Sequence, residues 1–172
     1  SETQGGATLK VLWRGGKARS RILEGSWDVV VLQDDLPEYR QPPAADGRER
    51  SAVVHENLST YLANFLEVVQ AAGARAVVFM AHPYQRLSGT TLRDICLAHK
   101  AVERDLQVAV APGAIALSML EERRDSLRNQ HLEMLDEDRE HPSEAGLFLH
   151  ALTIAAVVGG LQTLPLLQWA PA

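Results

Sequence analysis

The sequence places an aspartate three residues before a histidine, in the pattern Asp138-x-x-His141-Pro142-Ser143. A carboxylate at this spacing can lie beside the imidazole, fix its tautomer and stabilise the imidazolium form. Such a histidine can take a proton from a hydroxyl group and act as a general base. Pro142 suits the first turn of a following helix. The spacing alone fits equally well a charged loop in which Ser143 merely caps that helix, so both interpretations stand.

Two further features could bind a developing negative charge. Gly5-Gly6 begins a tight turn, where glycine lets the backbone approach another group closely. Gln33 ends an apolar run, and its side-chain amide can donate a hydrogen bond to an oxyanion. Taken singly, an ordinary loop and an ordinary polar strand end are the favoured interpretations of these residues.

The elements that must position these residues follow from the apolar pattern. Short, continuous apolar runs predict strands at about 27–33, 76–81 and 108–111, buried on both faces as in a parallel sheet. Residues at three- and four-residue spacing predict helices at about 51–72, 91–106, 114–124 and 142–158. This alternation predicts a three-layer α/β/α fold, with a surface loop at 36–50. Polar groups after the strands, such as His82, fall where open parallel sheets bind ligands.

The composition sets limits on the class of protein. The 172 residues suffice for one domain, and no repeat or linker divides them. A net charge of -5 argues against a nucleic-acid partner. Cys96 is the one cysteine, which excludes an internal disulfide framework. The longest apolar run, 147–161, is too short to span a membrane and predicts a buried helix. A metal site built from the strand-end and loop acids with His82 is a minor alternative, since no ligand spacing supports it.

The order of the motifs resembles that of the SGNH (GDSL-like) hydrolases. Gly-Gly-Ala-Thr-Leu at 5–9, Trp-Asp-Val-Val-Val-Leu-Gln at 27–33 and Asp-x-x-His-Pro-Ser-x-x-Gly at 138–146 occur in the family's order. The resemblance is strongest to a bacterial branch with a "WDYVVLQ" strand and a "DxxHPSxxG" end. It covers nearly the whole chain, and it implies a flavodoxin-like SGNH hydrolase fold in a single domain, 1–172.

The resemblance also implies roles for four residues. His141 would be the general base of a catalytic triad and Asp138 its orienting acid. Gly6 would offer a backbone N–H to the oxyanion hole. Gln33 would donate its amide where many members of the family have an asparagine. No metal and no organic cofactor is implied.

The family's nucleophilic serine has no counterpart in these residues. It belongs to a Gly-Asp-Ser or Gly-Asn-Ser block at the end of the first strand, and neither block occurs in the sequence. We therefore expect a partial SGNH domain that lacks its first strand and nucleophile and is inactive by itself. With an upstream serine it would hydrolyse an ester such as an O-acetyl or short acyl group on a carbohydrate. The alternative is a non-catalytic SGNH-like module that binds a glycan or a protein. Oligomeric state and compartment stay open, since an upstream segment could carry an export signal.

Overall fold

A three-stranded parallel sheet forms the centre of the molecule. The computed structural model describes residues 5–35, 50–84, 90–123 and 133–160, of which residues 50–57 are described by their backbone alone. The strands are β1 (Val29–Gln33), β2 (Arg75–Phe79) and β3 (Ala109–Ala111), in the order β1-β2-β3. Gln33 is in register with Phe79, and Phe79 with Ala111, so all three strands end at the same edge. The predicted strands are confirmed to within two residues.

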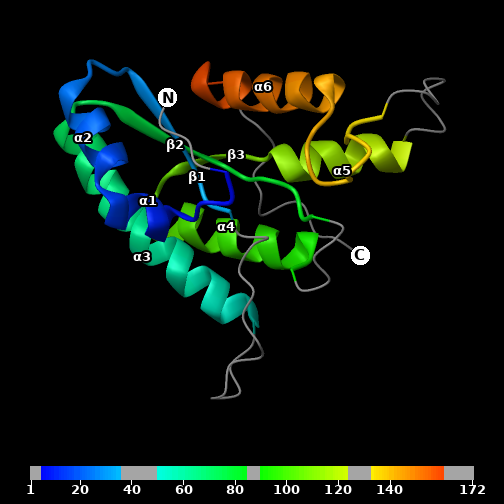
Figure 1. The fold of residues 1–172 in the computed structure, drawn as a ribbon, viewed down its shortest axis with the longest axis horizontal. Coiled ribbons are helices and arrows are strands. Elements are labelled where there is room, and N and C mark those ends of the chain that lie inside the picture. Colours follow the sequence, from blue (N-terminus) through cyan, green and yellow to red (C-terminus); the bar gives the residue numbers. More distant parts are fainter. Residues whose placement is uncertain (1–4, 36–49, 85–89, 124–132, 161–172) are drawn as a thin grey trace.

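Two layers of helices cover the two faces of this sheet (Figure 1). On one face, Leu32, Val78 and Val110 join the main core with side chains from helices α1 to α4. On the other face, Val77 and Phe79 pack against the end of α6. Alternate residues of each strand therefore enter opposite cores, as strand geometry requires. The predicted three-layer α/β/α arrangement is confirmed.

Four of the six helices in the described residues lie where the apolar spacing predicted them. They are α3 (Arg50–Ala71), α4 (Leu92–Leu106), α5 (Gly113–Arg123) and α6 (Glu144–Val158). The chain leaves α3 through Gly73, whose φ of +72° is a left-handed conformation that glycine adopts readily. The predicted loop at 36–50 lies outside the described residues, except for Arg50 at the start of α3.

Helices α1 (Leu9–Gly15) and α2 (Lys17–Glu24) were not predicted from the sequence. Both are short, and Gly16 separates them with a φ of +78°. Thr8 caps α1 by accepting a hydrogen bond from the Val11 amide. Leu9 of α1 and Ile22 of α2 join the main core, so tertiary burial stabilises segments whose own helical pattern is weak.

Helix α6 spans the sheet from its carboxyl edge back to its amino edge. At its far end the Arg75 guanidinium, at the start of β2, donates a 2.7 Å hydrogen bond to the Val158 carbonyl. The helix covers β2 and β3, and Val31 of β1 stays 43% exposed on this face. The prediction that all strands are buried on both faces is therefore wrong for β1. Among the described residues, β1 pairs with β2 on one side and with no strand on the other.

The first turn of α6 fits tightly under the segment before it. A Cβ at Gly146 would collide with the Met134 carbonyl oxygen and lie 3.0 Å from the Pro142 Cβ. Gly146 thus allows α6 to pack closely on the preceding loop.

The described residues contain no helix long and apolar enough to cross a lipid bilayer.

We expect the substitution Gly146→Ala to destabilise the fold although alanine favours helices. The added methyl group meets a backbone carbonyl that cannot move aside easily, which costs about 1–3 kcal/mol. Urea denaturation followed by circular dichroism measures the change. Gly15→Ala is the matched control, because a Cβ at Gly15 has no atom within 4 Å. Equal midpoints for Gly146→Ala and the wild type would contradict this packing.

Candidate active site

The loop that carries Asp138 and His141 is closed by backbone hydrogen bonds. The Asp136 amide donates to the His141 carbonyl at 2.8 Å, and the Ser143 amide donates to the Met134 carbonyl at 3.1 Å. The chain turns between these bonds through Arg139, which has a left-handed φ of +57°. The described part, 133–143, is therefore a short, tightly paired loop leading into α6.

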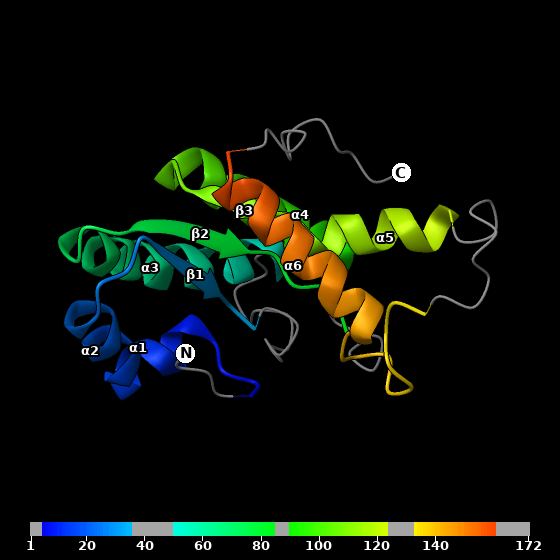
Figure 2. The same ribbon diagram turned by 90° about the horizontal axis from the view of Figure 1, so that it is seen from above.

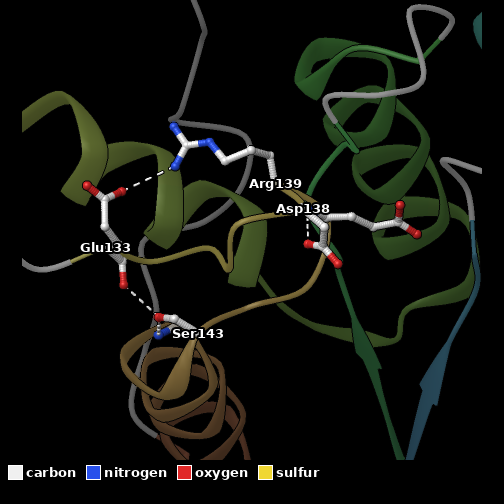
Figure 3. A network of polar contacts seen from close by, with 6 residues as sticks. Glu133, Asp138, Arg139 and Ser143 are labelled. Atoms are coloured by element: carbon white, nitrogen blue, oxygen red, sulfur yellow. Dashed lines mark hydrogen bonds and ion pairs between the residues drawn. The ribbon is translucent and has the colours of Figure 1, made fainter.

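Side chains hold the same loop from outside. The Ser143 hydroxyl donates a 2.6 Å hydrogen bond to the Glu133 carbonyl and accepts one from the Gly146 amide. The Arg139 guanidinium reaches across to the Glu133 carboxylate at 3.2 Å (Figure 3). Ser143 is thus the N-cap of α6, as one interpretation of the sequence has it, and its hydroxyl is engaged in the cap.

Asp138 and His141 form a hydrogen-bonded pair in this loop. The Nδ1 atom of His141 lies 2.7 Å from Oδ2 of Asp138. The other carboxylate oxygen, Oδ1, accepts hydrogen bonds from the amides of Glu140 and His141, both at 2.9 Å. Because a carboxylate only accepts, Nδ1 carries the proton and Nε2 is the nitrogen left to act as a base. This is the orientation that an acid–histidine pair requires.

The pair shifts the protonation equilibria of both groups. The hydrogen bond from His141, followed by the two amide bonds, holds the pKa of Asp138 well below its usual range. The same hydrogen bond and the negative charge of Asp138 raise the pKa of His141 above 6.5. Both side chains are exposed, by 69% for His141 and 51% for Asp138. The imidazole is therefore an accessible, strengthened base at the surface.

The glycine turn lies at the carboxyl end of β1. Gly6 has a φ of +67°, and a Cβ at this position would be 3.7 Å from Oδ2 of Asp35. The Leu9 amide donates a 3.3 Å hydrogen bond to Oδ2 of the buried Asp34, which fixes the start of α1 on the same strand end. Gln33, the last residue of β1, is exposed there. The structure thus places Gly6 and Gln33 at one edge of the sheet.

Asp34 is a buried carboxyl group in an unfavourable environment. Its Oδ1 atom has no hydrogen-bond partner among the described residues. Burial raises its pKa to about 7, and the charge of neighbouring Asp35 adds to this effect, while the bond from the Leu9 amide opposes it. Near neutral pH the group therefore holds its proton part of the time.

His82 connects the sheet to the Asp138–His141 loop. It follows the carboxyl end of β2, is buried, and its Nε2 atom lies 2.8 Å from the Glu140 carbonyl oxygen. The turn at Gly6, the strand ends and the loop before α6 all lie toward the edge at which the strand arrows point (Figure 2). The structure thus brings the two halves of the predicted site to one edge of the sheet. No group of three or more His, Cys, Asp or Glu side chains suited to a metal ion occurs in the described part of the chain.

Comparisons with known proteins agree with this architecture. One solved structure, described as "a putative SGNH hydrolase from Slackia heliotrinireducens", superposes with a TM-score of 0.61 at 24% identity, over 90% of this chain and 81% of that one. The fold is SGNH-like. LAE5, an alpha/beta hydrolase enzyme from the metagenome of Lake Arreo in Spain, superposes with a TM-score of 0.56 at 17% identity, over 92% of this chain and 71% of that one. No family model and no curated protein matches the sequence.

The SGNH-like fold confirms the fold class that the sequence predicted. The predicted roles of Asp138, His141, Gly6 and Gln33 stay predictions, although each residue lies at the appropriate edge. The sequence predicted His82 at a strand end but gave no indication of its contact with the loop that carries Asp138 and His141. The signal that was available is its position directly after a buried parallel strand, where functional groups gather.

We expect Asp138→Asn to lower the pKa of His141 toward 6.5. The amide can still accept from Nδ1–H, but it removes the negative charge that stabilises the imidazolium. Side-chain NMR titration of His141 measures this pKa. Glu137→Gln is the control, since it removes a negative charge from an exposed position of the same loop and leaves the Asp138–His141 hydrogen bond in place. An unchanged His141 titration in Asp138→Asn would show that the pair does not exist in solution.

We also expect Asp34→Asn to change how stability depends on pH. Because the folded state retains the Asp34 proton up to about pH 7 and the unfolded chain releases it near pH 4, wild-type stability falls as the pH rises through this window. The variant lacks this loss, so its free energy of unfolding relative to that of the wild type should increase by about 2–3 kcal/mol between pH 5 and pH 8. Urea denaturation at several pH values tests this. Asp28→Asn, at the exposed opposite end of the strand, should follow the wild-type profile.

Proposed function

We propose that this chain is the acid–histidine part of an SGNH-type serine ester hydrolase. The observation that carries the proposal is the 2.7 Å hydrogen bond from His141 Nδ1 to Asp138 Oδ2, with the imidazole exposed at the carboxyl edge of an SGNH-like sheet. The hydrolase-like fold by itself fits many reactions. The oriented base, the glycine turn and Gln33 favour acyl transfer among them.

In this proposal the nucleophile is a serine that these 172 residues do not supply. Its hydroxyl oxygen attacks the ester carbonyl carbon while His141 Nε2 takes the hydroxyl proton. Asp138 stabilises the resulting imidazolium. The carbonyl oxygen becomes an oxyanion, which the Gly6 amide and the Gln33 side-chain amide stabilise by hydrogen bonding.

The second half of the reaction uses the same residues. His141 returns its proton to the departing alcohol, which leaves an acyl-serine ester. A water molecule then loses a proton to His141 and attacks the acyl carbon of this ester. His141 returns this proton to the serine oxygen as the bond to the acyl group breaks, so that the acid leaves and the serine hydroxyl is restored. No cofactor takes part. The substrate class that we propose is an O-acetyl or short acyl ester on a carbohydrate, as the family resemblance implies.

The test is to express the gene with the coding sequence upstream of Ser1 and to assay p-nitrophenyl acetate. His141→Ala should lower kcat/KM by about 10³-fold or more, because loss of a triad base removes most of the proton-transfer catalysis. Activity of the unaltered enzyme should rise with pH through the raised pKa of His141, since only the neutral imidazole accepts a proton. Glu137→Gln should keep the parent activity.

Two outcomes would contradict the proposal. Undiminished turnover in His141→Ala would exclude this histidine as the base. A coding sequence that lacks a Gly-Asp-Ser or Gly-Asn-Ser block upstream of Ser1 would exclude the serine route and favour the non-catalytic binding module. The chain 1–172 alone, assayed beside the longer protein, should show no turnover above background.

A further inference from the structure

His82 is a buried histidine that the proposed reaction does not use. It is 4% exposed, follows β2 and lies 58 residues before Glu140 in the sequence, yet its Nε2 atom lies 2.8 Å from the Glu140 carbonyl oxygen. A carbonyl oxygen only accepts hydrogen bonds, so Nε2 must carry the proton and donate it. The segment after β2 is therefore joined to the Asp138–His141 loop by a hydrogen bond from the His82 side chain.

The group that His82 holds is the peptide unit between Glu140 and His141. The carbonyl of this unit accepts from His82, and its N–H, on His141, donates a 2.9 Å hydrogen bond to Asp138 Oδ1. The C=O and N–H of a trans peptide point in opposite directions within one plane. His82 and Asp138 thus hold the same planar group from its two sides and fix its rotation.

This arrangement acts directly on the direction of the imidazole. The Cα of His141 belongs to the held peptide plane, so a rotation of the plane would swing its side chain away from Asp138. Donation to the carbonyl also polarises the amide and strengthens the N–H bond to the carboxylate. The two hydrogen bonds therefore support each other.

His82 is itself packed against two neighbouring aromatic rings. Its ring centroid lies 5.7 Å from that of His150 on α6 and 5.9 Å from that of Tyr84. Phe79 of β2 packs its ring edge-on against His150 at 5.0 Å. Burial lowers the pKa of His82 and lowers that of His150 to about 4, so both rings are neutral near pH 7. The donor is thus a neutral group in a fixed position.

We propose that His82 is a positioning residue for His141, which it aligns by donating a hydrogen bond to the Glu140 carbonyl. The inference deepens the proposed function, because the residue that His82 aligns is the proposed general base. The effect of His82 on His141 does not require enzymatic activity, so it can be measured on the 172-residue chain. His82 touches no reacting atom in this scheme.

A pair of amide substitutions at His82 isolates the hydrogen bond. The amide nitrogen of glutamine is as many bonds from Cβ as Nε2 of histidine, whereas that of asparagine is one bond closer and falls short of the carbonyl. We expect His82→Gln to keep the raised pKa of His141 and its backbone amide shift. His82→Asn should move the pKa toward 6.5 and displace the amide resonance upfield. Side-chain and backbone NMR titrations measure both quantities.

His99→Leu is the control for a general loss of stability. His99 is a fully buried histidine that bonds within α4, to the Ile95 carbonyl, so its loss should lower the melting temperature and leave the His141 titration unchanged. Identical His141 titrations in the His82→Gln and His82→Asn variants would overturn the proposal. An equal displacement in His99→Leu would also overturn it, because the effect would then be general.

The longer, serine-containing protein provides a separate readout. His82→Asn should lower kcat by roughly 10- to 100-fold with little change in KM, as expected when a catalytic group is misaligned, and His82→Gln should restore most of it. If the longer protein hydrolyses no ester while the NMR difference between His82→Gln and His82→Asn is present, the proposed function is refuted and the positioning role stands. Full esterase activity in His82→Asn would refute the positioning role alone.

Discussion

The Asp138 carboxylate accepts three hydrogen bonds from two consecutive residues, and the geometry of the candidate site depends on them. One comes from the His141 ring and two from the main-chain amides of Glu140 and His141. An ionised acceptor makes such bonds stronger than neutral ones. The same charge therefore bends the loop, orients the imidazole and increases its basicity. The remaining contacts of the loop, to the sheet and to α6, hold this carboxylate in place.

The sheet edge concentrates polar groups that the core cannot fully satisfy. Asp34, His82 and His150 are all buried, and each has a side-chain atom without a partner among the described residues. Burying such atoms costs stability, which a purely structural edge would avoid. Buried ionisable groups of this kind often gather near functional sites. Their position beside the Gly6 turn and the His141 loop agrees with the proposed location of the active centre.

The sequence predicted those parts of the structure that depend on local pattern. The strands and the four longer helices follow from continuous or periodic apolar residues. The three-residue spacing allowed Asp138 to pair with His141 but fitted a charged capping loop equally well. Helices α1 and α2 were missed because each is too short to show a helical period and because they gain stability from the core around Leu9 and Ile22. The contact from His82 to Glu140 could not be predicted, since 58 residues separate the two and only the folded sheet brings them together. The exposure of Val31 could not be predicted either, because it depends on which strands α6 covers in the folded protein.

Main-chain atoms supply most of the acceptors that hold the loop, and this has a consequence for how the surface around His141 can vary. These acceptors include the carbonyl oxygens of Glu133, Met134, Asp136, Glu140 and His141, which any amino acid provides. Mutation at an exposed position of the loop can then alter the surface around the imidazole without altering how the imidazole is held. Arg139 is more restricted, because its left-handed backbone suits glycine, asparagine or aspartate and disfavours β-branched residues. The surface around His141 could thus diverge among relatives, or in a mutant library, while the imidazole keeps its orientation.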